Sequence, residues 1–589
     1  MALTPPSWDL TQLFPSHDSQ RLQDHLTRLD KDADAFISAY KGNVAILPAE
    51  NLRAAIHSYE ALSDGIAKVS AYAFLSYAED RSNSKIGTFY QNVNEHINRL
   101  TTELIFFTLE MNALTDAQLN DLYANDDQLM RYKPWIAQVR LFKGHQLSNE
   151  MERLMHEKSI PAEKGWIRLY DELCADMRFD IDGKPYPIAD VLNRMSHKDS
   201  EVRKAAAMAL AEGLKDNARV FAIIMNALSY NLLLDNKWRK FQRVDSARHL
   251  ENHIDADVVD TLTKSVKSAC SRLSHRYYVL KAKHFGQEKL NYWDRNAPYP
   301  QARDADIPWD EAKTIVLEAY REFSPTMADI ALMFFEQRWI DANLCPGKDS
   351  GAFSHPVAPS AHPYILMNYH GKQRCVMTLA HELGHGIHQV LSKDQGALMA
   401  DTPLTLAETA SVFGEMLTFQ RLLKRSTPAD KPYLLASKVE DMINTVVRQI
   451  AFYDFEKQIH TQRQSGELSV DDISTIWMNV QSESLGDAIH LDESYAMYWA
   501  YISHFIHAPF YVYAYAFGDC LVNSLYAHYQ AHPDGFEQAY IHLLKAGGSK
   551  RYDEAMRPFG FDLRAPEFWE KGLAMIEGLI DAFEAALES

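Results

Sequence analysis

Residues 376–391 read VMTLAHELGHGIHQVL, and the order of apolar and polar residues in this stretch predicts one amphipathic helix. At about 100° per residue, His381 and His385 fall on one face, about 40° apart, with Glu382 beside them. The opposite face collects the apolar side chains of Val376, Leu379, Ala380, Leu383, Ile387, Val390 and Leu391. We therefore expect the helix to pack by one side and to present His381-Glu382-Leu383-Gly384-His385 on the other.

Two histidines at this spacing predict a zinc site. Imidazoles one helical turn apart can bind one tetrahedral ion, and the carboxylate between them can reach a water held there. On this basis His381 and His385 are the predicted zinc ligands, and Glu382 is the predicted general base. The alternative is a chance match to a short pattern, and the separation of the polar and apolar faces argues against it.

A catalytic zinc site needs a third protein ligand. A third histidine in the pattern H-E-x-x-H-x-x-G-x-x-H is excluded, because Leu391 stands at its position and His388 replaces the glycine. A carboxylate from a following helix is the remaining common solution, and the acids in range are Asp394, Asp401, Glu408 and Glu415. Spacing favours Glu408, which small residues surround, and leaves Glu415 as the second candidate. Because Thr405 stands three residues before Glu408, a capping box is the other interpretation of this glutamate.

Helical periodicity dominates the rest of the chain, and only short stretches read as strands. Residues 177–188 predict a small hairpin, because apolar residues alternate with acids before the turn signal Asp182-Gly183. Residues 363–368 predict a strand close to the motif, which is either a plain edge strand or a strand that pairs with a peptide backbone. The predicted fold class is mainly α, with small β-sheet elements near the active site.

The size and composition of the chain limit the classes of protein to consider. Its 589 residues can bury a large core, and we expect an N-terminal helical subdomain over 1–195 and a mainly helical catalytic region over 196–589. The formal net charge of −19 argues against nucleic-acid binding. The N-terminus lacks a secretory pattern, no stretch reads as a membrane span, and the five cysteines include no C-x-x-C pair. These features predict a cytoplasmic protein without nucleic-acid or membrane partners, of undetermined oligomeric state.

Several short segments elsewhere in the chain accompany the motif His381 to His385. They are Gly351-Ala352-Phe353, Pro363-Tyr364-Ile365, Asn368-Tyr369, Thr378-Leu379-Ala380, Glu408, Trp8-Asp9-Leu10 and Pro509-Phe510-Tyr511-Val512-Tyr513. Together with His381 to His385 they resemble the oligoendopeptidase F family, relatives of thimet oligopeptidase. The resemblance touches nearly the whole chain and is most specific over 338–416 and 504–515. It implies a two-walled helical zincin-type molecule with a deep substrate channel, one zinc per chain at its floor, and Glu408 as third ligand.

Aromatic residues crowd the segment from Tyr495 to Phe517, which by default reads as core. The resemblance implies that a histidine and one or two tyrosines from this region close over the scissile bond and act on the developing oxyanion. We favour His507, Tyr511 and Tyr515, which share one face if the segment is helical, although Pro509 can bend it. The reserve candidates are His504 and Tyr513.

The expected activity is zinc-dependent endopeptidase cleavage of short unstructured peptides, with Glu382 as general base. A dipeptidyl carboxypeptidase or metallocarboxypeptidase on the same fold is the first alternative, and it needs a basic residue to bind a C-terminal carboxylate. A non-catalytic peptide-binding protein is the second alternative. The intact Glu382 argues against it, because a pure binder has no need of a base next to the metal.

Overall fold

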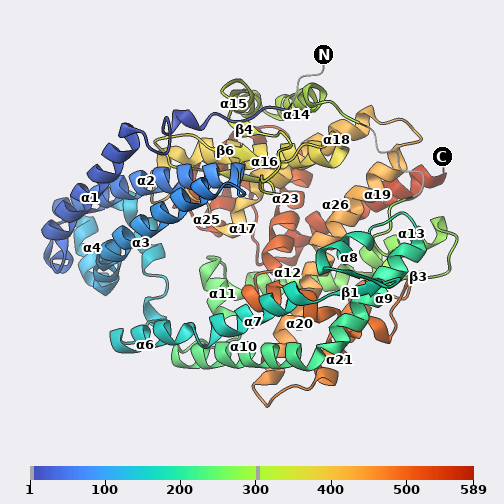
Figure 1. Ribbon diagram of the computed structural model, residues 1–589. Helices are drawn as coiled ribbons and strands as arrows, with labels where there is room; N and C mark the ends of the chain where they lie inside the picture. The colour runs from blue at the N-terminus through green and yellow to red at the C-terminus, as the bar shows by residue number, and fades with distance from the viewer. Residues whose placement is uncertain (1–4, 300–305, 589) are drawn as a thin grey trace. The chain divides into compact units, whose positions relative to one another are not determined.

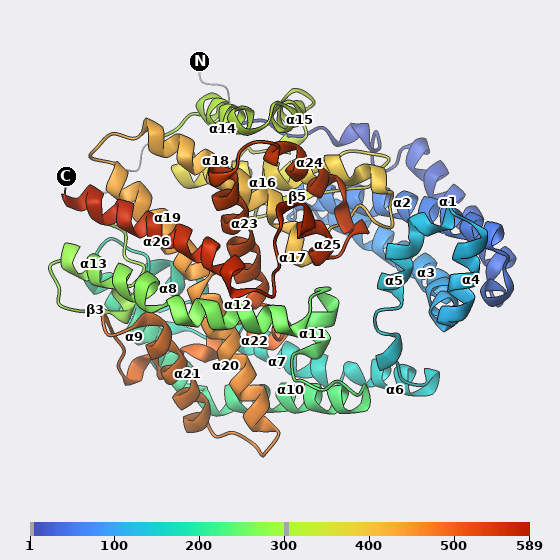
Figure 2. The same ribbon diagram turned by 180° about the vertical axis from the view of Figure 1, so that it is seen from behind.

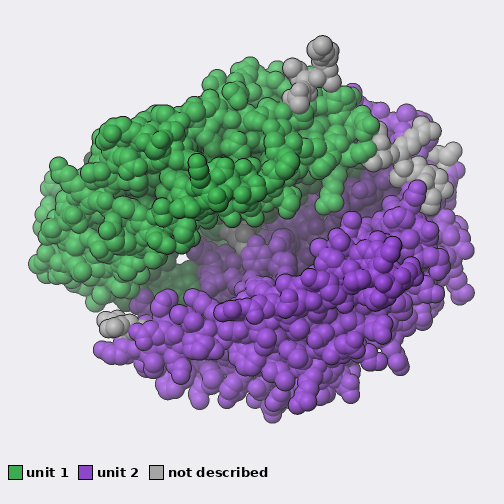
Figure 3. Space-filling view, viewed as in Figure 1, with its two compact units in different colours: residues 1–143, 304–424, 531–561 green, residues 144–303, 425–530, 562–589 purple. Residues whose placement is uncertain are grey.

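The computed structural model describes residues 5–299 and 306–588, which fold mainly as helices (Figure 1), and this confirms the predicted fold class. The chain forms two compact units, each assembled from three separate segments (Figure 3). Unit 1 consists of Met1–Lys143, Asp304–Lys424 and Ala531–Phe561, and unit 2 consists of Gly144–Arg303, Arg425–Gln530 and Asp562–Ser589. The subdomain boundary predicted at residue 195 stays a prediction.

The first helices of unit 1 pack against one another through apolar stripes of helical period (Figure 1). The apolar stripe of α1 buries Leu22, Leu29 and Phe36. The Phe36 ring meets the Phe107 ring edge-on, with ring centroids 5.1 Å apart. These helices are α1 (Gln20–Tyr40), α2 (Ala49–Glu79), α3 (Ser84–Ala113), α4 (Asp116–Asn125) and α5 (Lys133–Val139).

The helix predicted over 376–391 is α16, which runs from Gln373 to Ser392. Its predicted apolar face is buried, with Leu379, Leu383 and Ile387 fully inaccessible, and it packs against α14, α15 and α24. The other helices of this part of unit 1 are α14 (Trp309–Phe323), α15 (Pro325–Glu336), α17 (Leu404–Ala407), α18 (Thr409–Arg425), α24 (Phe536–Lys545) and α25 (Tyr552–Met556).

Two glycines let the backbones of α16 and α18 approach closely. A Cβ atom on Gly384 would collide with the carbonyl group of Ala410, and one on Gly414 would collide with the Tyr320 hydroxyl group. The Tyr320 hydroxyl donates a hydrogen bond of 2.8 Å to the carbonyl oxygen of Ala380. The close crossing therefore depends on Gly384, which lies between the two histidines of the motif.

A three-stranded sheet of unit 1 lies against α16, in the order β4 (Ile340–Asp341), β6 (Tyr364–Leu366), β5 (Phe353–His355). β6 confirms the strand predicted over 363–368, but it pairs with β4 in parallel and with β5 antiparallel. Both of its edges are therefore occupied, and the prediction that this strand is an edge strand or pairs with a peptide is wrong. β4 and β5 are the two edge strands instead.

In the described part of unit 2 the chain is mainly helical, with two short two-stranded sheets. α26 packs along α19 and α12, as both Figure 1 and Figure 2 show. Its buried residues include Trp569, Leu573 and Ile576. The helices of unit 2 are α6 (Asn149–Ser159), α7 (Glu163–Asp176), α8 (Ile188–Arg194), α9 (Ser200–Asp216), α10 (Ala218–Trp238), α11 (Ser246–Glu251), α12 (Ala256–Ala269), α13 (Arg276–His284), α19 (Lys431–Thr445), α20 (Val447–Arg463), α21 (Val470–Leu485), α22 (His504–His507), α23 (Tyr513–Ala531) and α26 (Pro566–Glu588).

The strands of unit 2 include the predicted hairpin, formed by β1 (Phe179–Ile181) and β2 (Lys184–Tyr186) in antiparallel register. Asp182 and Gly183 have φ values of 55° and 77°, as a type I′ turn requires. The second sheet pairs β3 (Leu290–Asn291) with β7 (Ile489–His490) in parallel. The hairpin follows from local turn chemistry alone, which is why the sequence predicts it correctly.

Candidate metal centre

Three residues of unit 1 bring metal-ligating atoms together, as predicted: His381, His385 and Glu408. His381 and His385 lie one turn apart on α16, and Glu408 lies at the junction between α17 and α18. The Nε2 atoms of the two histidines are 3.1 Å apart, and each lies 3.5 Å from Oε2 of Glu408. All three side chains are partly accessible, so an ion could reach them.

These separations fit one tetrahedral ion. Zinc with bonds of about 2.0–2.1 Å to nitrogen and oxygen separates its ligand atoms by about 3.3–3.4 Å. The three observed separations of 3.1, 3.5 and 3.5 Å lie close to that value. Three protein ligands also leave one position open, as catalytic zinc sites require.

A second set of contacts orients the ligands. Nδ1 of His381 lies 2.6 Å from Oε1 of Glu415, and the ring of His385 is hydrogen-bonded to the backbone of Ala407. The Ser411 hydroxyl donates a hydrogen bond of 2.5 Å to Oε2 of Glu408. Contacts of this kind fix the orientation of the rings and raise the basicity of the ligand atoms. Glu415, the second candidate for third ligand, therefore orients the ring of His381 in this structure.

The two histidines differ in pKa although both are largely enclosed, with side chains 27% and 21% exposed. Burial lowers both pKa values, but at His381 the hydrogen bond that its ring donates to Glu415, together with the charges of Glu415 and Glu408, outweighs burial, and the pKa rises to about 9. At His385 burial prevails, and the pKa falls to about 4. The carboxylates of Glu408 and Glu415 thus favour one positive charge at this position, which is the electrostatic condition for a bound cation.

Glu382 lies beside the ligands and is 5% exposed. Burial raises the pKa of its carboxyl group to about 7, while the charge of His381 and a hydrogen bond from the backbone of Ser354 act in the opposite direction. A carboxylate with a pKa near neutrality can accept and return a proton under physiological conditions. Its position next to the cluster agrees with the predicted role of base.

Sequence reasoning missed two residues that connect the metal cluster to the edge strand β5. Gln389 of α16 accepts a hydrogen bond of 2.9 Å from the Ser354 hydroxyl and donates one of 3.1 Å to the Ser354 carbonyl oxygen. The same strand residue bonds to Glu382 through its backbone. Gln389 follows His385 by four residues, so its place on the polar face of the helix is the signal that could have revealed it.

The aromatic segment of unit 2 brings His504, Tyr511 and Tyr515 together. His504 Nε2 lies 3.3 Å from the Tyr515 hydroxyl group, and the Tyr511 and Tyr515 rings meet edge-on with centroids 5.3 Å apart. The chain between them is not one helix, because α22 ends at His507, Phe510 has a φ of 60°, and α23 begins at Tyr513. The predicted helical alignment of His507 with Tyr511 is therefore broken.

The other two candidates of this segment have structural partners. His507 Nε2 lies 2.8 Å from Oδ1 of Asp171, in an exposed pair. The hydroxyl group of the buried Tyr513 lies 3.1 Å from Nδ1 of His249 and accepts a hydrogen bond of 2.8 Å from Asn252. The geometry thus joins His504, rather than His507, to the two tyrosines and places Tyr513 in the core.

These features define a metallopeptidase of the zincin type: a helix with an H-E-x-x-H motif whose glutamate is buried, and a second glutamate from the following helical segment. Comparison with known proteins agrees: residues 193–575 match peptidase family M3, and residues 110–179 match the family described as oligopeptidase F. The chain belongs to peptidase family M3 and is an oligopeptide-hydrolysing metalloendopeptidase.

Curated relatives cover most of the chain. Oligopeptidase PepF of Bacillus subtilis is 27% identical over 99% of this chain and 87% of its own length. An oligoendopeptidase F homolog of Borreliella burgdorferi is 28% identical over 90% of both chains.

Solved structures show the same fold. A crystal structure of a Chlamydophila abortus protein has a TM-score of 0.88 at 22% identity and covers 99% of this chain and 100% of its own. The structure of oligoendopeptidase-F from Enterococcus faecium has a TM-score of 0.71, also at 22% identity, and covers 97% of this chain and 99% of its own.

No helix within residues 5–299 and 306–588 has the length and apolar character that a membrane span needs.

Proposed function

We propose that the chain is a zinc endopeptidase in which His381, His385 and Glu408 hold one zinc ion and Glu382 is the general base. The observation that carries this proposal is the set of three ligand-atom separations, which match the edges of a zinc tetrahedron. When bound, zinc lowers the pKa of water and polarises a peptide carbonyl group.

The residues of the chain supply the proton transfers. Glu382 takes a proton from the attacking water and passes it to the leaving amine nitrogen, from a buried position next to His381 on α16. Glu415 keeps the His381 ring in one orientation throughout, because its carboxylate bonds the Nδ1 atom that faces away from Glu408.

We infer that the substrate backbone lies along the outer side of β5, where Ser354 already bonds to Gln389 and Glu382 and would exchange these contacts for contacts with the peptide. β5 bonds to β6 on one side, and none of the strands within the described residues bonds to its other side. An extended peptide added there would lie next to Glu382, to which Ser354 of β5 is already bonded. This arrangement supports binding of unstructured peptides, since a folded chain has no free extended backbone to offer.

We propose that Tyr511, Tyr515 and His504 stabilise the oxyanion. His507, which the sequence favours, is the second choice, because its Nε2 atom already contacts Asp171.

We also infer a cytoplasmic location. All five cysteines are free thiols, which a reducing compartment preserves.

Two measurements test the proposed function. Metal analysis of protein purified without chelator is expected to find one zinc per chain, and its absence would refute the zinc site. Product analysis on a peptide blocked at both termini separates an endopeptidase, which cuts it, from a carboxypeptidase, which cannot. A peptide that is bound but not cut would instead support the non-catalytic binding protein.

A further inference from the structure

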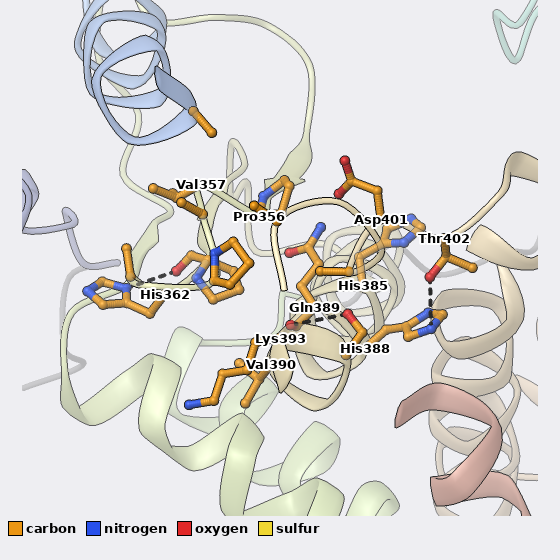
Figure 4. A pocket seen from close by; sticks show the side chains of 18 of the residues that line it. Pro356, Val357, His362, His385, His388, Gln389, Val390, Lys393, Asp401 and Thr402 are labelled. Carbon is orange, nitrogen blue, oxygen red and sulfur yellow. Dashed lines mark hydrogen bonds between the residues drawn. The ribbon is translucent and has the colours of Figure 1, made fainter. Parts of the chain in front are cut away.

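Buried polar side-chain atoms normally have a hydrogen-bond partner. His388 and Thr402 show this in the lining of a cavity of unit 1, where the imidazole Nε2 atom lies 3.2 Å from the hydroxyl group (dashed line in Figure 4). Three buried donor atoms of unit 2 differ, because none of them has a partner among the described residues: Nε of Arg295, Nε of Arg448 and Nε2 of Gln481. Each unmet donor destabilises the fold, so the three together call for a partner from outside the chain.

Tyr495, in the 3-10 helix Glu493–Tyr501, connects two of these donors. Nη1 of Arg295 donates a hydrogen bond of 3.4 Å to the Tyr495 hydroxyl group, which donates one of 3.2 Å to Oε1 of Gln481. The direction of this chain of hydrogen bonds is fixed, because a guanidinium group can only donate and a hydroxyl group carries a single proton. Oε1 of Gln481 is therefore the acceptor, and its Nε2 atom is left with unpaired protons.

Arg448 of α20 reaches the last residue of the same 3-10 helix. Its Nη2 atom donates a hydrogen bond of 3.5 Å to the Tyr501 hydroxyl group. Burial raises the pKa of Tyr278 to about 12, and the positive charges of both Arg295 and Arg448 oppose this rise. The two guanidinium groups therefore act on one buried hydroxyl group and belong to one cluster.

No carboxylate balances the two guanidinium groups. In the part of the chain that the structure describes, no carboxylate oxygen lies within 4.0 Å of Arg295 or Arg448. The buried Arg203, by contrast, pairs with Asp294 at 2.6 Å. Arg295 is only 8% exposed and stays charged at any physiological pH. Because a buried charge without a counter-charge is strongly unfavourable, the missing partner is expected to be negative.

We propose that Arg295, Arg448 and Gln481 bind one small inorganic anion, with the size and charge of chloride. A buried water molecule could also accept hydrogen bonds from these donors, but it brings no charge to offset the guanidinium groups. The three donor atoms are inaccessible to solvent, which suits a single-atom ion. Arg448 and Tyr501 are partly exposed, so an ion can reach the cluster from their side.

The bound ion would stabilise the helix that leads into the aromatic segment. This helix ends at Tyr501, and His504 begins α22 three residues later. Burial lowers the pKa of His504, and the charges of His507 and Arg448 lower it further, so the cluster is close enough to act on this histidine. The inference concerns unit 2 alone and does not depend on the proposed reaction.

The test follows thermal unfolding while chloride replaces gluconate at constant ionic strength. Gluconate is too large for a site built from inaccessible atoms, so it serves as the inert anion. We expect chloride to raise the Tm of the parent protein by roughly 1–3 °C in a saturable manner, as ligand binding to the folded state does. Bromide should replace chloride.

Three variants separate the site from general salt effects. Arg295→Met should lose the chloride response without loss of stability in gluconate, because it removes an uncompensated buried charge. Gln481→Glu adds a carboxylate next to Arg295, so its Tm in gluconate should exceed that of the parent and no longer depend on chloride. Arg219→Met, at an exposed position of α10, is the matched control and should keep the full response.

Two results would overturn the inference. A Tm of the parent that depends on neither chloride nor bromide would show that water alone satisfies the donors. A chloride response of equal size in the parent, Arg295→Met and Gln481→Glu would show that the salt acts elsewhere. If Arg295→Met does not fold, Arg448→Met takes its place at a partly exposed position, with an affinity for chloride at least about tenfold weaker than that of the parent as the expected result.

Discussion

Nδ1 of His381 lies 2.6 Å from Oε1 of Glu415, whereas Nε2 of the same ring lies 3.5 Å from Oε2 of Glu408. The two glutamates that were candidates for third ligand thus lie on opposite sides of one imidazole, and only Glu415 is hydrogen-bonded to it. One of them shares the ligand cluster, and the other fixes the ring that belongs to it.

This division of roles predicts different effects on zinc affinity. Glu408→Ala removes a ligand and is expected to abolish stable zinc binding. Glu415→Ala removes only the contact that orients His381, so affinity should fall by about 10–100-fold. Competition with a chromogenic chelator measures both affinities. Equal losses, or a larger loss for Glu415→Ala, would contradict the assignment.

Removing the base should separate metal binding from turnover. Glu382→Gln keeps the size of the side chain and leaves His381, His385 and Glu408 in place, so zinc content and thermal stability should stay unchanged. Loss of general base catalysis is expected to lower kcat by about 10²–10⁴-fold. Residual activity of a tenth of the parent, in a preparation free of parent protein, would exclude Glu382 as the base.

The close crossing of α16 and α18 predicts that Gly384 cannot carry a side chain. Gly384→Ala places a methyl group against the carbonyl of Ala410, and this overpacking should cost about 1–3 kcal/mol of unfolding free energy and weaken zinc binding. Gly578→Ala on α26, where nothing lies within 4 Å of the added atom, is the control and should be neutral or stabilising. Urea unfolding measures both, and similar values for the two variants would refute the requirement at residue 384.

A buried carboxyl group in unit 2 predicts a pH effect on stability. Burial raises the pKa of Glu456 to about 8, partly offset by the Phe510 amide, which donates to it at 2.9 Å, and by Arg248. Because the folded pKa lies above the unfolded value, stability is full below about pH 4.5 and falls as the pH rises through 8.

Glu456→Gln keeps an acceptor for the Phe510 amide but cannot ionise. Relative to the parent protein, its unfolding free energy should therefore increase between pH 5 and pH 8.5, by roughly 1–3 kcal/mol. Urea unfolding at both pH values tests this. A difference between the two proteins that does not change with pH would show that Glu456 ionises as readily in the folded chain as in the unfolded one.

The aromatic cluster predicts which histidine matters for turnover. His504 lies 3.3 Å from the Tyr515 hydroxyl, whereas His507 is bound to Asp171. His504→Ala should therefore lower kcat by about 10²–10³-fold, as the loss of an oxyanion contact does, and His507→Ala should have little effect. Steady-state kinetics on one blocked peptide, with zinc content as control, checks the order. The reverse order would return His507 to the role predicted from the sequence.

The sequence by itself determined the features that depend on local geometry. The spacing of His381 and His385 places both on one face of a helix, because the rotation per residue is the same in every α-helix. The Asp182-Gly183 pair specifies its hairpin because two consecutive positive φ values favour these residues. Neither prediction depends on which other segments pack against these residues.

The tertiary structure decided what depends on contacts between distant segments. The Oε2 atom of Glu408, rather than a carboxylate oxygen of Glu415, lies 3.5 Å from the Nε2 atoms of both histidines, because α18 crosses α16 at Gly384, a contact that periodicity cannot reveal. β6 is central because strands on either side pair with it, although its sequence reads like an edge strand. His504 meets Tyr515 because the chain turns at Phe510, whose backbone amide donates a hydrogen bond to the buried Glu456 of α20. Helical period sets which side chains share a face, but only packing sets which faces meet.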